Sequence, residues 1–144
     1  MFALDNRHED VVRYLVSKNA NVKDWIYSVY KNKNESEIYY YSPLKAAITN
    51  ASIETLKVIL DKKPNVNPII AIDIANPQER TNIFYDNLRP LEYAIKTGDV
   101  DKVLLLAKYG ADIHPKGRKP LIYAIDIGAS EAMIKTLLEL STNK

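Results

Sequence analysis

The chain contains no cysteine, which excludes disulfide bridges, thiolate metal sites and a cysteine nucleophile. Only four glycines occur among its 144 residues, and they form no glycine-rich phosphate loop. The two histidines, His8 and His114, lack the further histidines or clustered carboxylates that a metal site normally needs. These absences predict a protein that is not an enzyme and that binds no metal and no cofactor.

Long apolar runs and strong charge are also missing. No apolar stretch approaches the roughly 20 residues that cross a bilayer, and the chain becomes polar from Asp5 onward, so no signal peptide is visible in it. The net charge is +2, with lysines and acidic residues interspersed, whereas nucleic-acid binders usually carry a basic stripe. We therefore expect a cytoplasmic protein that neither enters membranes nor binds nucleic acid.

What the sequence does contain is a repeat. Three segments open in the same way, with Ser42-Pro43-Leu44, Arg89-Pro90-Leu91 and Lys119-Pro120-Leu121. Each continues to an Ala-Ile pair, a polar kink and a second apolar stretch. Proline suits the first position of a helix, because its missing N–H is not needed there. Each segment therefore predicts a short helix, a turn and a second helix.

The second helix of each unit has apolar residues at helical spacing. These residues are Val11, Val12, Leu15 and Val16; Ile53, Leu56, Val58, Ile59 and Leu60; Val100, Val103, Leu104, Leu105 and Leu106; and Met133, Ile134, Leu137 and Leu138. None of these helices is able to bury its apolar face alone, but helices stacked side by side form one continuous core. The pattern thus predicts a solenoid, which usually works through its surface.

This pattern resembles the ankyrin repeat, whose hallmark is Thr-Pro-Leu-His-x-Ala, then Gly-His, a Val-Val-x-Leu-Leu-Leu helix and Gly-Ala-Asp-Val-Asn. Gly110-Ala111-Asp112-Ile113 matches the closing piece, and His8 stands at the Gly-His position. The resemblance implies an all-α fold, an ankyrin-repeat α-solenoid of helix-turn-helix units with short connecting fingers or loops. A single domain, 1–144, would contain repeats at about 1–23, 42–67, 89–114 and 119–140. The first repeat begins within a helix, so we expect sequence to precede it.

Two insertions, at about 24–41 and 68–88, interrupt this period, and their conformation is left open. Pro43 and Pro90 stand 47 residues apart, against a family period of about 33. The first insertion holds the only tryptophan, Trp25, and half of the ten tyrosines. In the ankyrin family, insertions and fingers project toward the concave, ligand-binding side, and Tyr and Trp are enriched at binding hot spots. The alternative is that these aromatic residues pack over the neighbouring repeats.

The resemblance also maps a partner-binding groove onto the sequence. Concave positions correspond to Asp5 and Asn6, Thr49 and Asn50, Lys96 and Thr97, and Asp126 and Ile127, and finger positions to Tyr41, Leu88 and Arg118. From the groove and the aromatic insertion we expect these partner-binding residues: Trp25, Tyr40, Tyr41, Asn50, Leu88, Lys96, Arg118 and Asp126. At each position the alternative is a solvated surface without a partner.

The resulting expectation is a non-catalytic protein-protein interaction module, monomeric, with a protein partner of unknown identity. Two alternatives stay open: an accessory or regulatory ankyrin segment of a larger protein, and a structural module that self-associates through the second insertion. Richness in Lys, Asn, Ile and Tyr indicates an AT-rich genome. Ankyrin-like proteins of intracellular bacteria and viruses often engage host proteins, so delivery into a host cell as an effector is a further alternative.

Overall fold

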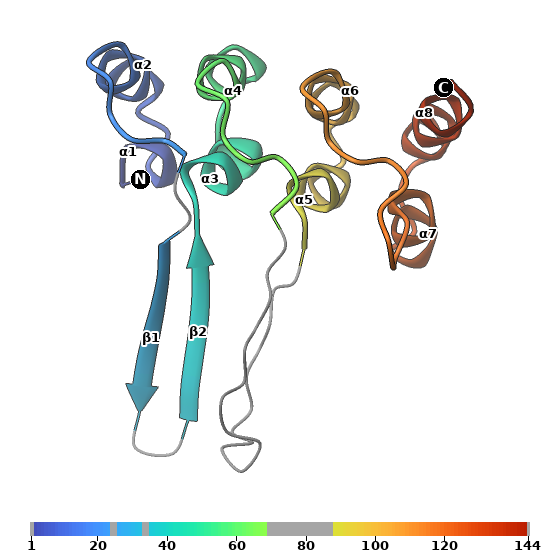
Figure 1. Ribbon diagram of the computed structural model, residues 1–144, viewed down its shortest axis with the longest axis horizontal. Coiled ribbons are helices and arrows are strands. Elements are labelled where there is room, and N and C mark those ends of the chain that lie inside the picture. Colours follow the sequence, from blue (N-terminus) through green and yellow to red (C-terminus); the bar gives the residue numbers. More distant parts are fainter. Residues whose placement is uncertain (1, 24–25, 33–34, 69–87, 144) are drawn as a thin grey trace.

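The computed structural model describes residues 2–23, 26–32, 35–68 and 88–143, with the main chain alone described for residues 2, 26–32 and 35–41. These residues form eight helices and two strands (Figure 1). The elements are α1 (Phe2–Asp5), α2 (Glu9–Ser17), β1 (Ile26–Asn32), β2 (Glu35–Tyr41), α3 (Pro43–Asn50), α4 (Ile53–Leu60), α5 (Pro90–Thr97), α6 (Val100–Lys108), α7 (Pro120–Asp126) and α8 (Glu131–Thr142).

The helices form four consecutive pairs that stand side by side in chain order. The pairs are α1–α2, α3–α4, α5–α6 and α7–α8, and the two helices within each pair are in contact. The odd-numbered helices form one layer, in which each contacts the next, and the even-numbered helices form a second layer in the same way (Figure 1). The first and last pairs therefore stand at opposite ends of the stack. The helical body confirms the all-α prediction.

Short polar side chains begin four of the eight described helices. The hydroxyl of Ser42 accepts a 2.9 Å hydrogen bond from the Lys45 N–H at the start of α3. Ser52, Asp99 and Ser130 cap α4, α6 and α8 through their own side chains. These bonds satisfy main-chain N–H groups that have no partner within a helix.

The distance from the starting proline to the cap of the second helix differs by one residue among the pairs. Nine residues separate Pro43 from Ser52, and nine separate Pro90 from Asp99, whereas ten separate Pro120 from Ser130. The last pair thus has one residue more than the second and third pairs between its starting proline and the cap of its second helix. Equivalent positions in the second helices are therefore defined by their distance from the cap, and those in α3, α5 and α7 by their distance from the starting proline. In α1, which has no such proline, Leu4 stands four residues before the cap of α2, as Ile48 does before Ser52.

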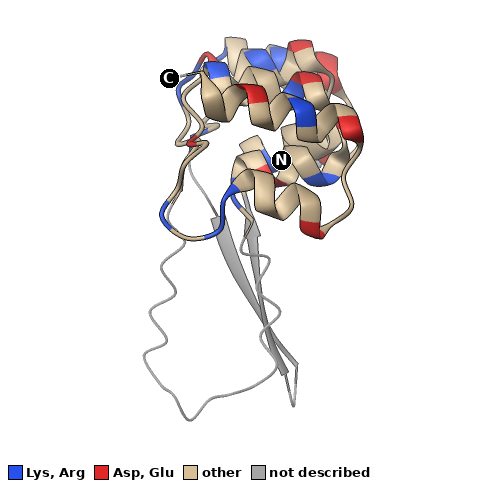
Figure 2. Ribbon diagram, turned by 90° about the vertical axis from the view of Figure 1, so that its right-hand side faces the viewer, with Lys and Arg blue, Asp and Glu red and all other residues tan. Residues whose placement is uncertain are grey.

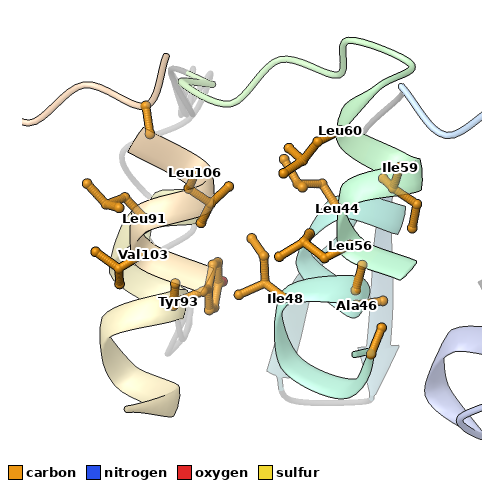
Figure 3. Close-up of a cluster of buried hydrophobic side chains, with 14 of the residues drawn as sticks. Leu44, Ala46, Ile48, Leu56, Ile59, Leu60, Leu91, Tyr93, Val103 and Leu106 are labelled. Atoms are coloured by element: carbon orange, nitrogen blue, oxygen red, sulfur yellow. The ribbon is translucent and has the colours of Figure 1, made fainter. Parts of the chain in front are cut away.

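One core runs through the stack and is built from equivalent positions of successive pairs. Ile48 of α3 and Tyr93 of α5 point toward one another across the gap between these helices (Figure 3). Ile48 is fully buried and Tyr93 is 5% exposed. Leu56 and Val103, which stand four residues after their caps, are also fully buried. Burial against neighbouring pairs, rather than helix propensity, stabilises helices this short.

The first insertion contains a two-stranded antiparallel hairpin. Strand β1 pairs with β2 in a register that sets Ile26 opposite Tyr41 and Asn32 opposite Glu35. The hairpin leaves the stack on the side of the odd-numbered helices and ends directly before Ser42, the cap of α3 (Figure 1). A β-hairpin is thus added to the helical body at the insertion whose conformation the sequence left open. The second insertion lies largely outside the described residues, which include only residues 68 and 88 of it.

Candidate partner-binding surface

A row of polar residues follows the carboxyl ends of the odd-numbered helices. Lys96 near the end of α5 and Asp126 at the end of α7 are exposed, and Asn50 at the end of α3 is half-buried. Because successive odd-numbered helices are in contact, these positions lie along one edge of the layer. The structure therefore brings Asn50, Lys96 and Asp126 into one row, which we call the helix-end row.

A second row lies at the opposite ends of the same helices. Tyr41, Leu88 and Arg118 each stand directly before the residue that caps an odd-numbered helix. A helix of eight residues is about 12 Å long, which sets the spacing between the two rows. Leu88 is half-buried and packs against the core, so only part of its side chain faces outward.

Arg118 has a structural role that the sequence did not indicate. Its Nε donates a 3.0 Å hydrogen bond to a carboxylate oxygen of Glu92, and its guanidinium lies 4.5 Å from the centre of the Tyr123 ring. The Glu92 side chain is only 4% exposed, whereas that of Arg118 is 45% exposed. The other Glu92 oxygen accepts a 2.8 Å bond from the N–H of Arg89 at the start of α5. Arg118 therefore neutralises a buried carboxylate while leaving almost half of its own side chain in solvent.

Basic residues gather around Arg118 in the loop between α6 and α7. Lys116 and Lys119 are exposed in this loop, which is the blue stretch that leads into α7 in Figure 2. Arg89 approaches from the preceding loop and donates a 3.1 Å bond to the carbonyl of Lys116. Its Nη1 is buried and has no hydrogen-bond partner among the described residues. We call Arg89, Lys116, Arg118 and Lys119 the basic cluster. Lys116 and Lys119, which lie within two residues of Arg118, were the sequence signal that could have indicated this cluster.

The aromatic part of the predicted site is only partly described. Trp25 lies outside the described residues. Tyr40 and Tyr41 belong to β2, where Tyr40 pairs with Tyr27 and Tyr41 with Ile26. Tyr41 directly precedes Ser42, the cap of α3, and therefore stands at the base of the hairpin. The prediction that these three residues bind a partner stays a prediction.

No protein-family model matches this chain, and no curated protein matches its sequence. The equivalence of the four helix pairs rests on two features of this structure, the spacing of the helix caps and the buried positions that the pairs share.

Other features of the described residues offer little chemistry. Within them, no group of three or more His, Asp and Glu side chains is arranged to hold a metal ion. No helix there is long and apolar enough to cross a bilayer. An open depression of about 330 Å³ lies beside the loop after α2 and is lined by Asn19, Ala20, Asn21, Val22, Lys23 and Lys62. His8 caps α2 without a side-chain bond, and His114 lies exposed in a loop, so neither histidine belongs to a cluster.

Proposed function

We propose that this chain is an ankyrin-like repeat domain that binds a protein partner without catalysis, using the surface of its odd-numbered helices. The observation that carries the proposal is the helix-end row, in which polar side chains of different kinds stand at or near the carboxyl ends of three successive odd-numbered helices. A stacked scaffold of this type holds its surface residues in fixed positions, so binding avoids most of the entropy cost of ordering them.

The basic cluster indicates the chemistry of the partner. Lys116 and Lys119 are exposed, and the half-exposed Arg118 keeps N–H groups beyond the one that binds Glu92. Arginine is well suited to carboxylate recognition because of its planar, forked donors. We expect the partner to present acidic side chains to this loop, with association that weakens as ionic strength rises.

A capture experiment with matched variants tests the proposal. The full chain is immobilised and exposed to a lysate, and bound proteins are identified by mass spectrometry. The row variant carries Asn50→Arg, Lys96→Glu and Asp126→Arg. Its control reverses exposed charges on the even-numbered helices, with Glu54→Lys, Lys57→Glu and Lys135→Glu. A protein retained by the wild type and the control, but lost from the row variant, supports the proposal.

Two further variants separate the remaining parts of the surface. Lys116→Glu with Lys119→Glu tests the basic cluster while leaving the Arg118–Glu92 pair intact. Trp25→Ala with Tyr40→Ala and Tyr41→Ala tests the aromatic insertion. Each variant is first checked for helical content by circular dichroism. If the row variant retains the same proteins as the wild type, the helix-end row is not a binding site and the proposal fails.

A further inference from the structure

The first helix pair exposes apolar residues at positions that every other pair buries. Val11 and Leu15 stand three and seven residues after the cap of α2, and each is 43% exposed. The same two positions in the other pairs are occupied by Thr55 and Ile59, Lys102 and Leu106, and Met133 and Leu137, none of which is more than 7% exposed. Val11 and Leu15 form what we call the leading end face.

Hydrogen bonds show which way these positions face. The hydroxyl of Thr55 donates to Glu9 of α2, and the ammonium of Lys102 donates a 2.8 Å bond to the carbonyl of Ile48 in α3. Each of these residues thus reaches the pair that precedes its own. Val11, at the equivalent position, faces the place where a pair preceding α1–α2 would stand.

The last pair shows the complementary exposure. Ile125 of α7 is 53% exposed, whereas its equivalents Leu4, Ile48 and Ile95 are at most 4% exposed. Leu138 of α8 is 45% exposed, whereas its equivalents in the first two pairs, Val16 and Leu60, are at most 2% exposed. Ile48 and Leu60 point toward α5 and α6, that is, toward the next pair (Figure 3). Ile125 and Leu138 therefore form a trailing end face, directed where a following pair would stand.

A charged pair is repeated at the two ends. Glu9 and Arg13 form an ion pair in α2, and Glu131 and Lys135 form one at the equivalent positions of α8. Glu9 accepts hydrogen bonds from the N–H and the hydroxyl of Ser52, the cap of the next pair. Glu131 has no such pair beyond it, and its side chain is 81% exposed. A second copy in the same register presents His8 at the Ser52 position, where an imidazole N–H is a suitable donor to Glu131.

We propose that the trailing end face of one copy of this chain binds the leading end face of another, so that copies stack head to tail. Within the chain, each of the three junctions between successive helix pairs is formed by the same kind of packing, and the proposed contact would repeat it between copies. It is heterologous, so each added copy leaves an open face at both ends and the assembly does not close at a dimer. Its residues are other than those of the helix-end row and of the basic cluster, and it does not invoke the second insertion, to which the sequence assigned the alternative dimer.

Sedimentation velocity of the full chain tests the proposal over a range of concentrations. The wild type is expected to gain mass steadily with concentration, without a plateau at the dimer. Leu15→Glu blocks the leading face and Ile125→Glu the trailing face, and each is expected to weaken self-association at least about tenfold. Leu104→Glu on α6 is the matched control, because Leu104 is 44% exposed but lies on neither end face, and it should associate as the wild type does.

Mixing the two blocked variants gives the decisive readout. An equimolar mixture of Leu15→Glu and Ile125→Glu retains one intact pair of faces and is expected to form a dimer of one copy of each, and nothing larger. A wild type that stays monomeric at every concentration overturns the proposal. So does either variant alone that associates like the wild type, since this places the contact elsewhere. A mixture that stays monomeric also overturns it, provided that both variants remain helical.

Discussion

In a continuous helix the N–H of Ser52 would donate to the carbonyl of Ile48, but in this protein each of the two groups bonds to a charged side chain of a different neighbouring pair. The N–H of Ser52 donates a 2.8 Å hydrogen bond to the carboxylate of Glu9, which belongs to the preceding pair. The carbonyl accepts a 2.8 Å bond from the ammonium of Lys102, which belongs to the following pair. The kink between α3 and α4 is therefore stabilised from both sides by oppositely charged side chains, which helps to fix three helix pairs relative to one another.

Replacing Lys102 by methionine tests this bond while keeping most of the apolar stem. Lys102 is 7% exposed, so its loss leaves the carbonyl of Ile48 without its donor in a buried place. A hydrogen bond to a charged group contributes about 1.5–3 kcal/mol, and we expect a decrease of this size in the free energy of unfolding. Urea denaturation followed by circular dichroism measures it. Lys108→Met, at an exposed site on the same helix, should change stability by less than about 0.5 kcal/mol.

Glu9 should make stability depend on pH in the acid range. Hydrogen bonds from the hydroxyls of Ser52 and Thr55 lower the pKa of Glu9 below its ordinary value of 4.5. A carboxyl with a lowered pKa in the folded state contributes stability above its unfolded pKa, and loses it as pH falls through the folded pKa. Glu9→Gln should therefore be less stable than the wild type at neutral pH, with the difference shrinking below about pH 4.5.

Unfolding free energies of both proteins from neutral pH to about pH 3 test this prediction. Thr55→Val removes one of the two hydroxyl donors, so its pH dependence should begin closer to the ordinary pKa. A constant difference between wild type and Glu9→Gln across the whole range would contradict the assignment.

In a double-mutant cycle of Arg118 and Glu92, the loss of Arg118 should cost more stability when Glu92 is present than when it is replaced by glutamine. Arg118→Ala leaves a buried carboxylate with one remaining bond from the N–H of Arg89, and we expect it to cost about 1–3 kcal/mol. Because Arg118 is half exposed, its own charge is well solvated when Glu92 is changed. Glu92→Gln in the Arg118→Ala background should therefore recover part of the lost stability, which thermal or urea unfolding of the four proteins measures. Purely additive effects would show that the pair is not coupled.

Two equivalent isoleucines should respond differently to truncation. Ile48→Ala opens a cavity at a fully buried position and should cost about 2–5 kcal/mol. Ile125→Ala removes a side chain that is 53% exposed, and its cost in dilute monomeric protein should be below about 1 kcal/mol. Urea denaturation at low concentration measures both. Equal costs would mean that Ile125 is buried in solution, contrary to its position on the trailing end face.

Much of the fold was predictable because its signals are local. Proline before Leu44 and Leu91, and short polar residues such as Ser52 and Asp99, begin helices through bonds within one turn. The hairpin was not predicted, although β1 and β2 are rich in the tyrosine, valine and isoleucine that favour strands. These residues lie outside the repeats, so the repeat pattern predicted no structure for them. Their pairing joins residues on two separate strands, which a pattern of helical spacing does not reveal.

The candidate site, too, was predictable only in the part that depends on local sequence. The repeat register by itself placed Asn50, Lys96 and Asp126 at or next to the ends of successive first helices, and so predicted that they lie in one row. It did not reveal that Arg118 neutralises Glu92, because a contact between residues 26 positions apart depends on how two loops meet.

The sequence by itself determined the helix starts, the repeat register and the apolar positions, because these depend on neighbouring residues and on the period of one helix. Only the tertiary structure decided which equivalent positions are buried. Ile48 and Ile125 occupy the same place in their pairs, yet one is fully buried and the other is 53% exposed. Burial depends on whether another pair stands beside a residue, and this is a property of the stack rather than of the repeat.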